Sequence, residues 1–213
     1  MAVIEYEHEP IRGLPGDLPP GEEILWQGAP DWRVLCRTAL HPGWVAGYFA
    51  LFAALALASG SLFGLVASLV SAGLVIGLLA VFAALVARTT VYTITNRRVV
   101  LRIGVALNTC INLPLALIGS AKLRAHAEGF GDLVLVPCGP HRIGYAMLWP
   151  HARPLRFSRA QPMLRALPGA QRVADILTRA CDAVVEVERS ETAPRPVTQP
   201  VAPTPITARK ATA

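Results

Sequence analysis

The stretch TALHPGWVAGYFALFAALALASGSLFGLVASLVSAGLVIGLLAVFAALVA, residues 38–87, contains no Asp, Glu, Lys or Arg. A helix needs roughly 20 residues to cross about 30 Å of hydrocarbon, so this stretch is too long for one span. The run Ala58-Ser59-Gly60-Ser61 offers a turn, because Gly and Ser are common where a chain reverses. The sequence therefore predicts a helical membrane hairpin with spans at about Pro42–Ala58 and Leu62–Ala87.

Basic residues flank the hairpin at both ends and are missing from its turn. They are Arg33, Arg37, Arg88, Arg97 and Arg98. Under the positive-inside rule, ends rich in Lys and Arg stay in the cytoplasm. We therefore predict a multi-pass protein of a bacterial inner membrane with both termini cytoplasmic. Trp32 and Trp44 suit the aromatic belt at the membrane surface.

Small residues form rows along the predicted spans. The rows contain Ala46, Ala50, Ala54 and Ala58 in the first span, and Gly73 and Gly77 in the second. In lipid, such rows let helix backbones approach closely. Either the two spans pack on each other through them, or one face docks another membrane protein or a second copy of the chain. Solute transport is not indicated, because the centre of the hairpin has no ionisable group.

After residue 87 the hydrophobic period changes from that of a helix to that of strands. Strands are predicted at Val91–Thr95, Val99–Ile103, Ile118–Ala125, Leu133–Val136, Ile143–Trp149 and Leu155–Phe157. A later apolar stripe at helical spacing contains Val173, Ile176, Leu177, Ala180 and Val184. The expected fold is a membrane α-helical hairpin plus an α+β soluble domain, an antiparallel β barrel or sandwich closed by a C-terminal helix.

Composition divides the chain into five parts. They are an acidic segment at 1–21, a first strand and approach to the membrane at 22–37, the two-span hairpin at 38–87, a basic cytoplasmic domain with its C-terminal helix at 88–189, and a disordered Pro-rich tail at 190–213. Residues 88–167 hold eleven Lys or Arg and two acids. This charge reflects either the positive-inside bias alone or a surface for membrane lipids or an acidic protein. Nucleic acid is not expected as a partner, because no binding motif accompanies the charge.

Catalytic and metal-binding patterns are missing from the sequence. Gly129-x-Gly131 lacks the dinucleotide fingerprint, there is no P-loop or G-x-S-x-G, and the four cysteines show no CxxC spacing. We therefore predict no enzyme activity and no metal site. His41, just before the first span, is the exception to consider. Its imidazole could ligate a chlorin magnesium, or it could be an interfacial or capping histidine.

Several long motifs carry a resemblance to a known family. They are EPIRGLP at 9–15, LPPGEEILWQGAPDW at 18–32, RTTVYTITNRRVV at 88–100, INLP at 111–114, LWPHARP at 148–154 and PMLRA at 162–166. These motifs resemble those of the photosynthetic complex assembly proteins of purple bacteria, the PuhB type. The resemblance covers about residues 9–188, and the hairpin matches by hydrophobicity alone.

The resemblance implies a bacterial pleckstrin-homology-like (PH-like) domain of seven strands closed by a C-terminal helix. Its first strand would be Glu23–Gln27, which would insert the hairpin into the domain. The implied role is assembly of the reaction centre, and indirectly of the core antenna, in an inner or intracytoplasmic membrane. No cofactor is required, although the family's association with bacteriochlorophyll and with self-association draws attention to His41 and to the alanine row.

Our reading of the sequence is a non-catalytic, chaperone-like assembly factor that holds or positions subunits or pigment. Candidate contacts with a partner or with lipid are Trp26, Trp32, Arg97, Arg98 and Trp149. Trp26 and Trp149 could equally belong to the domain core. The alternative function is a membrane-tethered lipid- or protein-binding PH-like module unrelated to photosynthesis.

Overall fold

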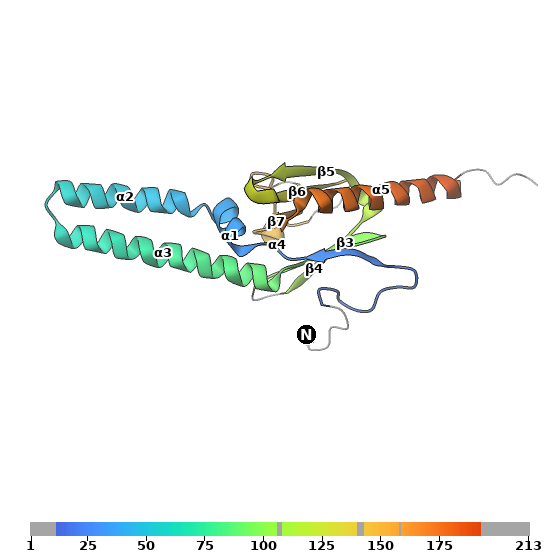
Figure 1. Ribbon diagram of the computed structural model, residues 1–213, viewed down its shortest axis with the longest axis horizontal. Coiled ribbons are helices and arrows are strands. Elements are labelled where there is room, and N and C mark those ends of the chain that lie inside the picture. The colour runs from blue at the N-terminus through green and yellow to red at the C-terminus, as the bar shows by residue number, and fades with distance from the viewer. Residues whose placement is uncertain (1–11, 106–107, 140–142, 158, 193–213) are drawn as a thin grey trace, which may run out of the picture.

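Three long helices and two small antiparallel sheets account for most of the described chain (Figure 1). The structure, a computed structural model, describes residues 12–105, 108–139, 143–157 and 159–192, and for residues 187–192 it describes the backbone alone. The helical hairpin projects from one end of the β domain, and the C-terminal helix extends toward the opposite end (Figure 1).

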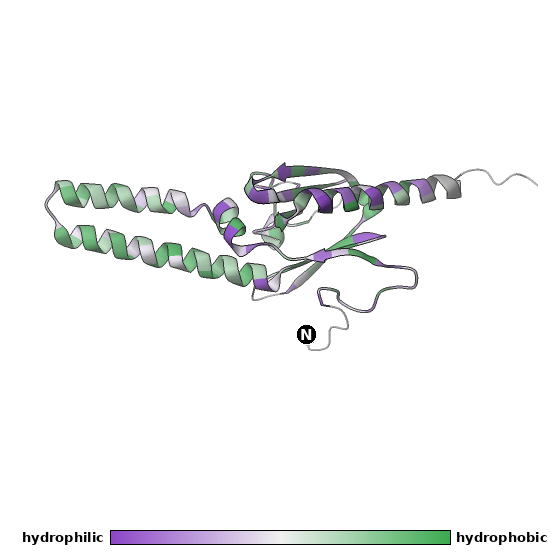
Figure 2. Ribbon diagram, in the orientation of Figure 1, coloured by the Kyte–Doolittle hydropathy of each residue, from purple (hydrophilic) through white to green (hydrophobic). Residues whose placement is uncertain are grey.

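The hairpin consists of α2 (Pro42–Ala58) and α3 (Leu62–Thr89). The helix at the first predicted span is confirmed at both ends, and the second runs two residues beyond its predicted end. Gly60 takes a positive φ of 69° in the connecting turn, and the Ser61 hydroxyl accepts a hydrogen bond from the Gly64 N–H at 3.1 Å. Hydrophobic residues are concentrated on these two helices (Figure 2).

α3 is long and apolar enough to cross a membrane, and only 11% of its most apolar window is buried. A core helix of a soluble protein would be mostly covered, so this exposure favours a membrane helix. α2 meets the same criterion only together with the helical residues Trp32–Leu40, from which it is bent by 60°. Among the described residues, therefore, one helix is long and apolar enough to cross a membrane, or two if the bent pair forms one span.

The bend before α2 has a local cause. Asp31 caps α1 (Trp32–Leu35) by accepting hydrogen bonds from two backbone N–H groups, and η1 (Cys36–Leu40) continues this helix. His41 then adopts a left-handed conformation, with φ of 49°. Because a proline disfavours helical geometry in the residue before it and fits the first turn of a helix, Pro42 ends one helix and starts the next.

The β domain contains two antiparallel sheets among the described residues. One has the order β1 (Ile24–Gly28), β2 (Val91–Thr95), β3 (Arg98–Ile103), β4 (Thr109–Pro114). The other has the order β5 (Ile118–Ala125), β6 (Phe130–Pro137), β7 (Met163–Pro168). Short helical turns η2 (Leu115–Leu117), η3 (Ala127–Gly129) and α4 (Tyr145–Leu148) connect strands. Trp26 pairs with Ile94, so the hairpin lies between two neighbouring strands of one sheet.

The two sheets and α5 (Ala170–Thr192) enclose one apolar core. Tyr92, Ile94, Leu133 and Leu164 are buried there, and α5 covers the core through the buried residues Val173, Leu177 and Ala180. Of the predicted helical stripe, these three residues and Val184 pack on the core, and Ile176 is half-buried beside them. The seven described strands and the closing helix agree with the resemblance, and the two hydrogen-bonded sheets form a sandwich, not a closed barrel.

All five residues of β2 are buried, because the segment before β1 covers the outer face of this sheet. Gln27 Nε2, on β1, donates to the Arg12 carbonyl at 2.7 Å, and Thr95 Oγ1 donates to Glu22 Oε1 at 2.8 Å. The buried Glu22 carboxylate also accepts two hydrogen bonds from the Arg98 guanidinium, at 2.8 and 3.0 Å. The N-terminal segment is therefore fixed to the domain from residue 12 to β1.

Strand prediction was right for β2, β3, β5 and β6, and β1 lies one residue from its expected position. It was wrong for Ile143–Trp149, which contains the short helix α4, and for Leu155–Phe157, which lies in a turn. Pro150 and Pro154 lack the N–H that a strand ladder requires, and strand pairing in this segment is limited to an isolated bridge between Ala152 and Pro162. β4 and β7 were missed. α5 continues to Thr192, past the predicted boundary at 189, and the predicted tail beyond it lies outside the described residues.

Candidate functional site at the base of the hairpin

The hairpin is joined to the β domain through packed apolar contacts. Leu35, Val86 and Ala166 form a small buried cluster between the helices and β7, and the Asp31 N–H donates to the Ala166 carbonyl at 2.9 Å. Phe82 stacks on Trp149 with ring centroids 5.6 Å apart. Because α3 passes into β2 through Thr90 alone, these contacts fix the direction of the hairpin relative to the domain.

A buried histidine completes this joint. His151 Nδ1 lies 2.7 Å from the Tyr92 hydroxyl, and Nε2 lies 3.2 Å from Thr90 Oγ1. The Tyr92 oxygen accepts a hydrogen bond from the Arg165 N–H at 3.2 Å, which leaves its own proton to donate to Nδ1. Burial, and next the Arg165 charge, lower the pKa of His151 to about 3, and burial raises the pKa of Tyr92. Both groups are neutral at physiological pH and act as structural links.

A basic cavity of about 650 Å³ opens beside this joint, between the hairpin base and the sheet β5-β6-β7. Its cationic lining residues are Arg37, Lys122, Arg124, Arg153 and Arg165, accompanied by His41 and His126. The one carboxylate among the lining residues is that of Asp132. With five cationic side chains and one carboxylate, the lining has an excess of positive charge, which attracts anions.

Asp132 is already engaged in the structure. Its Oδ1 accepts from the Ala166 N–H at 2.9 Å, and its Oδ2 lies 2.9 Å from His126 Nε2. Arg165 is only 5% exposed, and its Nη2 donates to the Ala152 carbonyl at 3.2 Å. Burial lowers the pKa of Arg165, and the Asp132 charge opposes that shift. Within the described part of the chain, Arg165 Nε is buried without a hydrogen-bond partner.

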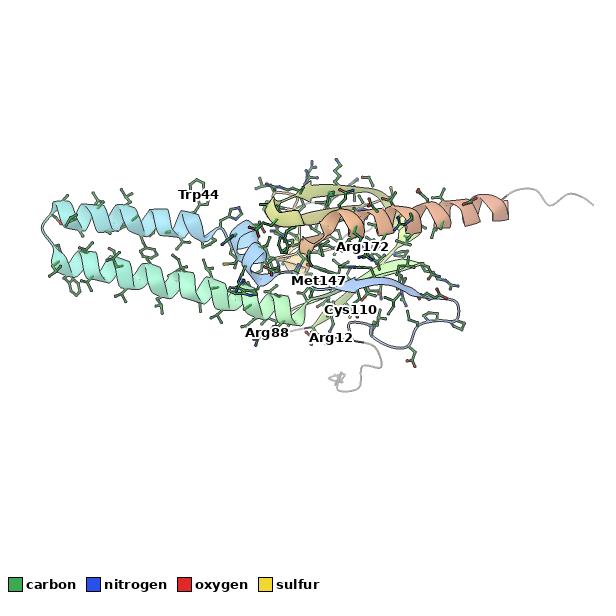
Figure 3. The ribbon with its side chains drawn as sticks, viewed as in Figure 1. Arg12, Trp44, Arg88, Cys110, Met147 and Arg172 are labelled. Carbon is green, nitrogen blue, oxygen red and sulfur yellow. The ribbon has the colours of Figure 1, made fainter. Side chains whose placement is uncertain are left out.

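A second hollow of about 650 Å³ lies along the outer side of α2. It is lined by Arg37, His41, Gly43, Trp44, Gly47, Tyr48 and Leu51. Trp44, labelled in Figure 3, is 81% exposed and projects away from α3. Because Arg37 and His41 line both hollows, the basic cavity and this apolar groove are adjacent.

His41 is exposed at the point where the two hollows meet. In the described structure its side chain makes no capping hydrogen bond to α2, so the capping interpretation is not supported. Its role as a bacteriochlorophyll ligand stays a prediction. No cluster of three or more His, Cys, Asp or Glu side chains that could hold a metal ion occurs among the described residues.

The predicted contact residues lie in different environments. Trp26 is half-buried against the core, and a side chain at Gly28 would strike its ring. Trp32 is 40% exposed beneath the Arg33 guanidinium, 5.3 Å from the ring centroid. Trp149 is 52% exposed beside the hairpin and packs on Phe82, outside the main core.

The predicted guanidinium contacts are engaged within the protein. Arg98 binds Glu22, and Arg97 Nη2 reaches the Pro20 carbonyl at 3.4 Å. Both therefore hold the N-terminal segment against the domain, and a role in partner contact stays a prediction.

The small-residue rows face outward from the hairpin. Ala46, Ala50, Ala54, Ala58, Gly73 and Gly77 are all exposed. The side of α2 that faces α3 instead carries the half-buried Val45, Phe49, Ala53 and Ala56. The two helices therefore pack on each other through other residues, and the predicted rows are left uncovered.

Sequence reasoning missed the cavity. Its residues come from η1, β5, β6, the segment before β7, and β7, and no local spacing connects them. The excess of positive charge in residues 88–167 was a signal for an anion site, but it gave no position. The buried charge of Arg165 had no signal in the sequence.

Comparison with known proteins adds two findings. The bacterial PH domain family matches residues 45–180, from within α2 to within α5. A protein of Rhodobacter capsulatus named "Uncharacterized 23.7 kDa protein in puhA 5'region" is 38% identical over 205 residues, which cover 92% of this chain and 96% of that protein. No solved structure matches the chain.

Proposed function

The chain belongs to the bacterial PH domain family, and we propose that it is a non-catalytic membrane assembly factor for the photosynthetic reaction centre. In this proposal α2 and α3 both cross the inner or intracytoplasmic membrane, and the β domain lies on the cytoplasmic side. The factor holds or positions a reaction-centre subunit during assembly and affects the core antenna indirectly.

The observation that carries this proposal is the outward direction of the small-residue rows. A hairpin that served only as an anchor would have no need of rows exposed to lipid. Ala50 and Ala54 on α2, and Gly73 and Gly77 on α3, allow another helix to approach the hairpin closely. The partner that this surface fits is a transmembrane helix of another subunit, or of a second copy of the chain.

The joint between hairpin and domain supports a positioning role. Leu35 and Val86 are 1% and 2% exposed, so the hairpin cannot swing freely at its base. A subunit docked on the hairpin would therefore be held at a fixed orientation to the cytoplasmic domain. Flexible tethering would not require a packed joint of this kind.

The photosynthetic context rests on sequence relationships. The motifs quoted above resemble those of photosynthetic complex assembly proteins, and the Rhodobacter capsulatus relative is named for its place in the puhA 5′ region. We carry this context to the present chain as part of the proposal.

The test is the absorbance spectrum of a strain that lacks the gene. We expect reduced reaction-centre absorbance while pigment synthesis continues. Complementation with the Ala50→Leu/Ala54→Leu double variant should fail to restore the absorbance, and Ala67→Leu, at an exposed position outside the rows, should restore it. Unchanged complexes in the deletion strain would rule out the assembly role.

A further inference from the structure

The basic cavity and the apolar groove meet at Arg37 and His41, which line both. We propose that the two hollows together bind one anionic phospholipid. Its phosphate headgroup occupies the cavity, and one acyl chain lies in the groove along α2. The proposal requires the hairpin to span the membrane, as in the proposed function, but it does not depend on a role in photosynthesis.

The charge of the cavity selects an anion. Lys122 and Arg124 extend from β5, and Arg37 faces them from the hairpin base. The carboxylate of Asp132 cannot neutralise all five cations and is already held by His126 and the Ala166 N–H. A phosphate group fits this lining, because guanidinium groups bind phosphate oxygens with paired, charge-assisted hydrogen bonds.

Arg165 gives an independent indication of a ligand. Its side chain is 95% buried on the wall of the cavity, and Nε lacks a partner among the described residues. A buried donor without an acceptor destabilises a fold, so such groups in native proteins call for a specific explanation. A phosphate oxygen in the cavity would supply an acceptor beside this guanidinium.

The groove argues for a lipid over a free anion. Gly43 and Gly47 leave space on one side of α2, and Trp44, Tyr48 and Leu51 form exposed apolar walls. From His41 to Leu51 the helix rises about 15 Å, which is about half the hydrocarbon thickness of a bilayer. The groove therefore has the length of one acyl chain in one leaflet.

The depth of the site in the membrane agrees with this arrangement. Counted from Leu62, about 20 residues of α3 cross the hydrocarbon, which leaves its last turns at the level of the headgroups. Ala83 and Val86 in those turns are buried against the domain. The cavity, at the same end of the hairpin, therefore lies where the headgroups of the cytoplasmic leaflet are found.

The experiment is native mass spectrometry of the full-length protein in mild detergent, titrated with phosphatidylglycerol or with phosphatidylcholine of the same acyl chains. Wild-type protein should retain phosphatidylglycerol preferentially. The Lys122→Gln/Arg124→Gln double variant should weaken that retention by about tenfold or more, since each charge-assisted hydrogen bond contributes substantially to binding. The charge-matched control Arg172→Gln/Arg179→Gln, on α5 and outside the cavity lining, should stay within about twofold of wild type.

Arg165→Gln should produce a loss similar to that of the β5 double variant. If Arg165→Gln does not fold, the exposed β5 residues still decide the question. Equal weakening by the α5 control variant would mean that general charge attraction explains the binding, and it would overturn the proposal. Equal retention of phosphatidylcholine would overturn it as well.

The groove variant separates a lipid from a free phosphate ion. Gly47→Leu fills the groove and should reduce phosphatidylglycerol retention, whereas Ala67→Leu should not. Inorganic phosphate should displace little bound lipid from the wild-type protein. If Gly47→Leu retains lipid normally and inorganic phosphate displaces it, the cavity binds a free anion and the lipid assignment is wrong.

Discussion

The pH dependence of stability should reveal the neutral His151 at the joint between hairpin and domain. In the folded protein the pKa of this imidazole is about 3, compared with about 6.5 when it is exposed to water. Below pH 6.5 the unfolded chain therefore binds a proton that the folded chain does not bind. The contribution of His151 is fully present above about pH 6.5 and is lost as the pH falls toward 3.

The expected size follows from this difference in pKa. Between pH 7.5 and 4.5, the free energy of unfolding should fall by about 2–3 kcal/mol through His151 alone. For a chain of this length, such a change corresponds to a shift of about 5–10 °C in Tm. Other groups also titrate in this range, so the informative quantity is the difference from a variant that lacks the imidazole.

His151→Gln provides that comparison, because glutamine keeps a donor and an acceptor and does not titrate. The assay is the Tm of the full-length protein in detergent at pH 7.5 and 4.5. We expect a pH-dependent loss in His151→Gln that is smaller than the wild-type loss by the amount above. Equal pH dependence of Tm in wild type and His151→Gln would mean that the imidazole is not held neutral in the folded protein.

Three further substitutions test the packing. Glu22→Gln should lower the free energy of unfolding by about 1.5–3 kcal/mol at pH 7, because it removes the negative charge and one of the two oxygens that accept from Arg98. Burial raises the pKa of Glu22, but its hydrogen bonds with Arg98 and Thr95 outweigh burial and lower it. The difference between the variant and the wild type should therefore shrink at pH 3, where the wild-type carboxylate begins to take up a proton. Leu35→Ala should lower the free energy of unfolding by about 2–4 kcal/mol and speed amide exchange in β7, which carries Ala166 of the same buried cluster. Gly131→Ala should cost about 1–3 kcal/mol in chemical denaturation, since the new methyl group would lie 2.8 Å from the Ala170 side chain.

Each of these substitutions has a matched control. Glu23→Gln changes an exposed carboxylate beside Glu22, and Leu25→Ala truncates a leucine that is 42% exposed. Gly16→Ala adds a methyl group with no described atom within 4 Å. Each control should change stability by less than about 0.5 kcal/mol. If a control lowers the free energy of unfolding as much as the substitution that it matches, burial and contact distance do not explain the effect.

The hairpin was predictable because the constraint on it is local. Fifty residues without a formal charge exceed one membrane crossing, and the Ser-Gly-Ser turn divides them in two. The bounds of α2 follow from this composition and from Pro42. The direction of the alanine row was not predictable, because it depends on which side of α2 meets α3.

Prediction in the β domain was limited by residues whose partners are distant in sequence. β2 and β3 form a hairpin, and their alternating pattern is visible locally. β7 is buried on both faces, so Met163–Ala166 show no alternation of exposed and buried positions. Leu148 fills the core from the short helix α4. In the sequence alone, such a buried apolar residue cannot be told from a buried residue of a strand. The basic cavity joins Arg37 to Arg165 across 128 positions, which no motif spacing records.

Site-specific photo-cross-linking during reaction-centre assembly tests the docking surface most directly. A photoreactive residue at position 54 faces outward on the alanine row, whereas one at position 53 faces α3. We expect a cross-linked product between position 54 and a membrane-embedded reaction-centre subunit, and little or none from position 53. Cross-linking of position 54 to lipid alone, in cells that are assembling reaction centres, would contradict it.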